Sequence, residues 1–122
     1  MIKPGTVILS GLALSLVVLL ACACSSPSSH TQASAASGSC QRVSAVLSDG
    51  PDPDADPVGY AEAQILPLRG ISVSDQALRT AITQLADAYQ QFFDTNGKNS
   101  SAKEAVAVAS KKLDSICPGA AS

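Results

Sequence analysis

Residues 74–97 read SDQALRTAITQLADAYQQFFDTNG, and this stretch decides the fold class. Its large apolar side chains recur at alternating intervals of four and three residues, which is the spacing of one face of an α-helix. They are Leu78, Ile82, Leu85, Tyr89 and Phe92. Ser74 is a suitable N-cap, and Asn96-Gly97 favours the left-handed backbone that ends a helix. The stretch therefore predicts an amphipathic helix that buries its apolar face against other helices.

A second helix is expected directly after this one. Ser101-Ala102-Lys103-Glu104 has the pattern of a capping box, in which Ser101 caps the helix. The apolar stripe that follows consists of Ala102, Val106, Ala109, Leu113 and Ile116. Cys117-Pro118-Gly119 ends the helix, so the third and fourth helices of the domain form a hairpin.

Two shorter helices are expected before residue 74. The first runs from Cys40 to about Ser48 with Ser39 as its N-cap, and Asp49-Gly50-Pro51 ends it. The second begins at Pro57 after an Asp56 cap, and Pro67 is expected to kink or end it. Its buried face would consist of Tyr60, Ala61, Gln64, Ile65 and Leu68. No stretch alternates as a half-buried strand does, so we predict an all-α fold, a small antiparallel bundle of about four helices in residues 39–119 with a short tail at 120–122.

Two cysteines lie where this domain begins and ends, Cys40 and Cys117. The chain has no tryptophan, two tyrosines and two phenylalanines, so its core is thin and would benefit from a covalent link. In an oxidising compartment this placement predicts a disulfide, which would stabilise the fold by about 4 kcal/mol in the chain-entropy model. A reactive or metal-binding pair is the alternative, but no CxxC spacing and no nearby histidine favours it.

The N-terminus has the pattern of an exported lipoprotein. Lys3 is followed by an apolar run from Val7 to Leu20, which is short for a membrane-spanning helix of about 20 residues, so residues 1–21 are interpreted as a signal peptide. Leu19-Leu20-Ala21-Cys22 resembles the lipobox of bacterial lipoproteins, and this resemblance implies lipid attachment at Cys22. Cys24 is the alternative, because cleavage there would leave no odd thiol outside the cell. Residues 22–38 are rich in serine and alanine, and we expect them to form a flexible tether.

The chain as a whole resembles the small Ser/Ala-rich envelope lipoproteins of actinobacteria, the mycobacterial type included. The likeness rests on the Leu-Leu-Ala-Cys motif, the polar tether and a helical domain bracketed by Cys40 and Cys117. It implies a lipid anchor on the extracytoplasmic face of the cell membrane, in a group where many members have no assigned activity. Some secreted mycobacterial haem-binding proteins also bracket a small helical domain with two cysteines, although their further sequence pattern is not found here.

Charge and residue types exclude several classes of function. The formal net charge is −2, and no basic patch suggests a nucleic-acid partner. The segment from Cys40 to Asp94 is acidic and the segment from Thr95 onward is basic. Asp52, Asp54 and Asp56 alternate as in a calcium loop, but Pro57 and Ala63 occupy the positions where an EF-hand has glycine and glutamate. We therefore expect no metal site.

Catalysis is not expected either. The lone histidine, His30, lies in the tether, and no nucleophile, metalloprotease or phosphate-loop motif is present, so we predict neither an enzyme nor a cofactor. The first hypothesis is a non-enzymatic interaction module that binds another envelope protein or a wall component through the third helix or the acidic loop. The alternative is a binder of a small ligand, lipid or haem, with a pocket lined by Tyr60, Tyr89 and Phe92. Because Phe92 and Phe93 are adjacent on a helix, we expect one of them to be exposed.

Overall fold

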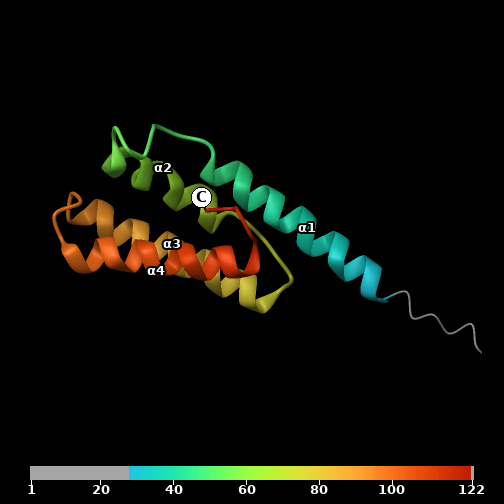
Figure 1. The fold of residues 1–122 in the computed structure, drawn as a ribbon. Coiled ribbons are helices and arrows are strands. Elements are labelled where there is room, and N and C mark those ends of the chain that lie inside the picture. Colours follow the sequence, from blue (N-terminus) through green and yellow to red (C-terminus); the bar gives the residue numbers. More distant parts are fainter. Residues whose placement is uncertain (1–27, 122) are drawn as a thin grey trace, which may run out of the picture.

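Four helices make up the structure, a computed structural model that describes the backbone of residues 28–121 and the side chains of residues 36–121. In chain order they are α1 (Ser28–Leu47), α2 (Pro57–Arg69), α3 (Gln76–Asp94) and α4 (Ser100–Ile116). Helices α2, α3 and α4 lie antiparallel beside one another, while α1 crosses the bundle and its N-terminal half projects beyond it (Figure 1). No strand occurs in the described part of the chain, and the predicted all-α bundle is confirmed.

The core consists almost entirely of aliphatic side chains. The most deeply buried large ones are Val43, Leu68, Leu78, Leu85 and Leu113. Among the side chains that the structure describes, every buried apolar residue lies between Val43 and Ala120, so the core of the described domain begins after residue 40. The predicted disulfide is present: Cys40 on α1 and Cys117 after α4 are joined, with their Cα atoms 5.4 Å apart. Ala120 is only 8 % exposed, so the domain extends past the boundary predicted at residue 119.

Helix α1 begins earlier than expected. The sequence predicted a flexible tether up to residue 38 and a helix from Cys40, whereas the helix begins at Ser28. Residues 36–38 are exposed and touch no core, so packing does not explain the extension. The intrinsic helix propensity of the alanines in this stretch favours the extension, whereas Ser37, Gly38 and Ser39 oppose it, so the early start has no single explanation in the sequence.

The helix caps were predicted in part. Asp56 caps α2 as expected, and its carboxylate accepts from the Gly59 backbone N–H at 2.9 Å. Helix α3 is capped by Asp75 rather than Ser74, with a 2.7 Å hydrogen bond from the Leu78 N–H. Helix α4 is capped by Asn99, which accepts from the Ser101 N–H, so the predicted capping box at Ser101 is wrong. In both corrected cases a strong capping side chain stands within two residues of the predicted cap, and sequence alone does not decide between such neighbours.

Pro67 does not end α2. The helix continues to Arg69, and the Gly70 N–H then closes it with hydrogen bonds to the carbonyls of Leu66 and Pro67. A proline inside a helix costs about 3 kcal/mol, and full burial of a leucine gains about 1.5–3 kcal/mol. Leu68 is 0 % exposed, so its burial in the core offsets most of this cost and the last turn is kept.

The turn between α3 and α4 follows the prediction. Asn96 and Gly97 have φ angles of 50° and 65°, and the Gly97 N–H donates to the Phe92 carbonyl at 2.8 Å. A Cβ atom on Gly97 would lie 3.0 Å from the Phe92 ring, so both the backbone angle and the space require glycine.

The antiparallel order gives the bundle two ends. We call one the disulfide end: it holds the end of α2, the start of α3, the end of α4 and the Cys40–Cys117 bond. The other, the loop end, holds residues 48–56, the start of α2 and the turn between α3 and α4. Helix α1 leaves the bundle past the disulfide end (Figure 1).

Candidate functional site: the tyrosine cleft

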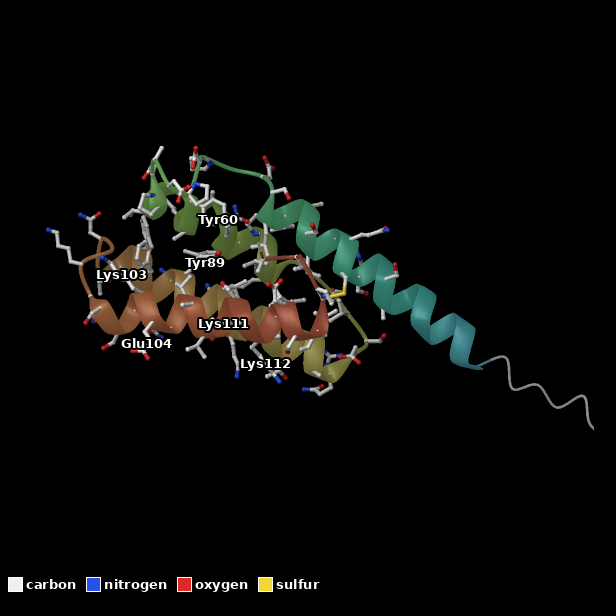
Figure 2. All side chains as sticks on the ribbon, in the orientation of Figure 1. Tyr60, Tyr89, Lys103, Glu104, Lys111 and Lys112 are labelled. Atoms are coloured by element: carbon white, nitrogen blue, oxygen red, sulfur yellow. A yellow bond between two sulfur atoms is a disulfide. The ribbon has the colours of Figure 1, made fainter. Side chains whose placement is uncertain are left out.

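Tyr60 on α2 and Tyr89 on α3 form the central contact of the candidate site. Their ring centroids are 5.8 Å apart and the ring planes meet at 83°, an edge-to-face arrangement that adds to the stability from burial alone. The two labelled rings lie together between α2 and α3 in Figure 2. The Tyr60 hydroxyl also donates to the Leu47 carbonyl at 2.7 Å, which ties the end of α1 to this pair.

Burial raises the pKa of both tyrosine hydroxyls above its ordinary value. Tyr89 is the more deeply buried, at 7 % exposure, and the neighbouring Tyr60 hydroxyl raises its pKa further. The Ser110 hydroxyl opposes these effects on the pKa only in part. Both hydroxyls are therefore neutral hydrogen-bonding groups at physiological pH, and neither is placed to act as a base.

An apolar hollow lies on one side of the tyrosine pair at the loop end. Its volume is about 200 Å³. The lining residues are Pro53, Pro57, Tyr60, Tyr89, Phe92, Lys103 and Val106. The structure thus brings together Tyr60, Tyr89 and Phe92, the three side chains for which the sequence predicted a shared pocket. The hollow is open to solvent and is smaller than the roughly 300–1,000 Å³ of typical small-molecule sites, so it holds a side chain or a small group more readily than haem.

A second, polar hollow of about 490 Å³ lies on the other side of the same pair. Residues 47–53 form one wall, with Asp49 and Asp52 among them, and residues 119–121 after α4 form another. Pro53, Tyr60 and Tyr89 line both hollows, so the tyrosine pair is the ridge between them. We call the two hollows together the tyrosine cleft. Sequence reasoning missed this polar half, because nothing local indicates that the C-terminal tail returns to the loop of residues 48–56.

Several aspartate carboxylates of this loop accept hydrogen bonds from nearby backbone N–H groups. Asp49 accepts from the Gly50 N–H, Asp52 from the Asp54 N–H and Asp56 from the Gly59 N–H. Among the described residues no group of three or more His, Cys, Asp or Glu side chains is arranged to hold a metal ion. The carboxylates of Asp49, Asp52 and Asp56 therefore shape the loop, and together with Asp54 they give it a negative charge.

Gln64 on α2 anchors the loop of residues 48–56 from the buried side of that helix. It is 1 % exposed, and its side-chain amide donates to the Asp49 carbonyl. Its Oε1 atom is buried without a protein partner. The sequence placed Gln64 on the buried face of the second helix, but its role as the anchor of the loop depends on a contact 15 residues away along the chain.

The exposed apolar side chains differ from the expectation. Phe92 and Phe93 are both half-buried, so neither is the exposed phenylalanine that was predicted. The large hydrophobic residues that are exposed are Leu66 on α2, at 76 %, and Val108 on α4, at 61 %. They lie on different helices outside the tyrosine cleft.

The predicted export signal and anchor lie outside the described residues. This applies to the signal peptide at residues 1–21, to Cys22 and to the alternative Cys24. Within residues 28–121, none of the helices has the length and apolar character needed to cross a membrane.

Comparison with known proteins adds no further assignment. The chain matches no protein-family model, and no significant match is found among curated proteins or solved structures.

Proposed function

We propose that this chain is a lipid-anchored, extracytoplasmic interaction module of the cell envelope, which is not an enzyme and which binds a segment of another envelope protein in the tyrosine cleft. The anchor would be a lipidated Cys22, on the basis of the Leu19-Leu20-Ala21-Cys22 motif. Two acyl chains on such a cysteine suffice for stable attachment to a membrane. The sequence from residue 40 onward contains no histidine, which agrees with a binding role rather than acid-base catalysis.

The observation that carries this proposal is the pair of unlike hollows on either side of Tyr60 and Tyr89. Tyrosine is enriched at the centres of protein interfaces, because it offers a large apolar surface and a hydrogen-bonding tip. A long, open cleft with one apolar and one polar half favours an extended segment over an enclosed small molecule.

The lining of the cleft describes the partner segment that would fit. An aliphatic side chain or a proline fits the apolar hollow between Pro57, Phe92 and Val106. A lysine, an arginine or a backbone N–H fits the polar hollow, beside the carboxylates of Asp49 and Asp52. The partner segment is therefore expected to pair an apolar side chain with a basic or hydrogen-bond-donating group.

Site-specific photocrosslinking tests this proposal. A photoreactive phenylalanine analogue is placed at Phe92, inside the cleft, and in a second strain at Val108, which is exposed on α4 away from it. Irradiation of intact cells should give a discrete adduct with the first protein and not with the second. Adducts of equal yield at both positions, or none at Phe92, would contradict binding in the cleft.

A small apolar ligand in the hollow of about 200 Å³ is the second candidate, and the aromatic and aliphatic lining beside Phe92 favours it. Native mass spectrometry of protein purified from its own envelope distinguishes the two proposals. A co-purified small molecule that is lost in Val106→Asp supports the ligand. A native mass equal to that of the protein alone, together with a crosslinked partner, supports the interaction module.

The anchor has a test of its own. Metabolic labelling with an acyl probe should mark the protein, and Cys22→Ala should abolish the label while Cys24→Ala keeps it. Labelling lost only in Cys24→Ala would move the attachment to Cys24. An unlabelled protein would contradict the anchor itself.

A further inference from the structure

The cations of the domain gather at the disulfide end. Arg69 ends α2, and Arg42 and Arg79 lie on α1 and α3 close to the loop that follows. Lys111 and Lys112 lie in the half of α4 that leads to Cys117, while Lys103 and Glu104 lie near its start (Figure 2). All five of the basic side chains at the disulfide end are exposed. The acidic residues near them are Asp75, Asp87 and Asp114, and Asp87 pairs with Arg69 and lines a surface hollow together with Lys112.

The loop end has the opposite charge. Its basic residues are Lys98 and Lys103. Its acidic residues, on the loop of residues 48–56 and on the adjoining parts of the helices, are more numerous: Asp49, Asp52, Asp54, Asp56, Glu62, Asp94 and Glu104. The folded domain is thus polarised along the bundle axis. The antiparallel arrangement of the helices produces this separation. The arginines lie in the first, acidic part of the chain, and the fold places them at the same end as the lysines of α4.

Local contacts hold the charges of Arg42 and Arg79 in place without neutralising them. Arg42 donates to the Ser72 carbonyl at 3.3 Å, and Arg79 donates to the Val73 carbonyl at 2.9 Å. Both guanidinium groups therefore lie on the loop between α2 and α3. In the described part of the chain the ion pair is Arg69 with Asp87, near the middle of α3, so Arg42 and Arg79 have no carboxylate partner there.

We infer that the basic disulfide end binds the anionic phospholipid headgroups of the membrane surface and so orients the domain with the tyrosine cleft facing outward. The inference rests on the proposed lipid anchor at the N-terminus. Helix α1 leaves the bundle past the disulfide end toward that N-terminus, so the anchor would hold this end nearest the membrane (Figure 1). Basic residues beside an anionic surface each contribute about 1 kcal/mol. The acidic loop end is repelled by the same surface, and this end carries most of the tyrosine cleft.

The length of α1 determines the geometry of this contact. From Ser28 to Cys40 the helix spans about 18 Å, whereas screening in physiological salt leaves electrostatic attraction a reach of about 8 Å. An upright α1 would hold the basic end beyond that reach. The domain therefore binds with α1 lying along the membrane surface, where the exposed residues 36–38 offer no bulky side chain that would lift it.

Binding to vesicles tests the inference without the lipid anchor. The probe is the unlipidated chain from residue 25 onward, which contains the whole core and the disulfide. It should sediment with vesicles of equal parts phosphatidylglycerol and phosphatidylcholine and not with vesicles of phosphatidylcholine alone. High salt should release it, since the attraction is electrostatic.

A matched pair of variants separates the basic end from net charge. Lys111→Gln with Lys112→Gln should weaken vesicle binding by about 30-fold, which corresponds to about 1 kcal/mol for each lysine. A single pair of variants gives the matched control: Lys112→Gln should weaken binding about 5-fold, whereas Lys98→Gln, which removes the same charge at the loop end outside the tyrosine cleft, should leave it nearly unchanged. An equal loss in both single variants, or equal binding to neutral vesicles, would overturn the inference.

The orientation is measured with introduced tryptophans, since the chain has none of its own. Ser115→Trp places the probe on an exposed site at the disulfide end of α4, and Ser101→Trp places it on an exposed site at the loop end. Brominated phosphatidylglycerol should quench the fluorescence of the Ser115→Trp variant strongly and that of the Ser101→Trp variant little, and the reverse order would overturn the inference. These vesicle experiments use neither a lipidated cysteine nor a partner protein. A failed acyl label or a missing crosslink would therefore contradict the proposed function and leave the inference about membrane binding untouched.

Discussion

At the scale of single residues, Tyr60 and Tyr89 make a pH-dependent contribution to stability. Burial raises the pKa of both hydroxyls in the folded state. Their contribution to the free energy of unfolding is therefore complete below the unfolded-state pKa of about 10 and is lost as the pH rises through the folded-state values. At about pH 10 we therefore expect less tyrosinate absorbance from the native protein than from the unfolded protein.

The absorbance titration is specific, because the chain contains only these two tyrosines. Protein unfolded in urea serves as the reference and should titrate near the ordinary value of about 10. A native titration curve that coincides with this reference would show that the two rings are not buried as a pair.

Gly59 is a second residue whose replacement tests a single contact, the Asp56 cap of α2. A Cβ atom there would overlap a carboxylate oxygen of Asp56, so alanine would displace the carboxylate that caps α2. Alanine gains about 1 kcal/mol of helix propensity over glycine, and a lost cap costs about 1 kcal/mol, so Gly59→Ala alone should be nearly neutral. In the Asp56→Ala background, which has no cap to lose, the same change should stabilise the protein by about 1 kcal/mol. Urea unfolding of the four proteins measures the coupling, and additive effects would contradict it.

At the scale of the helices, Asn99 is the residue on which the start of α4 depends. It accepts from the Ser101 N–H at 2.8 Å. Asn99→Ala should destabilise the protein by about 1 kcal/mol, while Ser101→Ala and Glu104→Ala, which would break a capping box, should have little effect. The comparison by urea unfolding distinguishes the two caps. A larger loss in Ser101→Ala than in Asn99→Ala would favour the capping box predicted from the sequence.

At the scale of the whole molecule, the disulfide holds α1 and the C-terminal tail to the bundle. Cys40 and Cys117 are 77 residues apart, and closing a loop of this length stabilises the fold by about 4 kcal/mol in the chain-entropy model. A small domain often has only about 5 kcal/mol in total, so reduction should lower the melting temperature strongly in circular dichroism. The double variant Cys40→Ser, Cys117→Ser is the control, and it should melt low with or without reductant. If the reduced and oxidised proteins melt together, the bond contributes nothing to this fold.

Much of the fold could be predicted from local pattern. The spacing of apolar residues and the residues that start or stop a helix are local properties. The spacing of Leu78, Ile82 and Leu85 with the Asn96-Gly97 stop was therefore enough to place α3, and the Asp56-Pro57 start was enough to place α2. The positions of Cys40 and Cys117 at the domain ends likewise predicted the bond. Predictions failed where neighbouring residues compete for one role, as at the caps of α3 and α4. At Pro67 the helix does not end, because burial of Leu68 offsets a local penalty.

By itself, then, the sequence determined the helical class, the hairpin of the last two helices, the disulfide and the common face of Tyr89 and Phe92, because helical period and chain ends fix which side chains of one helix share a face. That Tyr60 of α2 joins them was a hypothesis, and the packing of α2 on α3 decided it. Only the tertiary structure decided that the tyrosine pair divides two hollows, that Gln64 holds the acidic loop and that basic and acidic side chains separate to opposite ends. The physical reason is that these features join residues far apart in the chain. Their distances depend on how the antiparallel helices pack, and no local pattern encodes that packing.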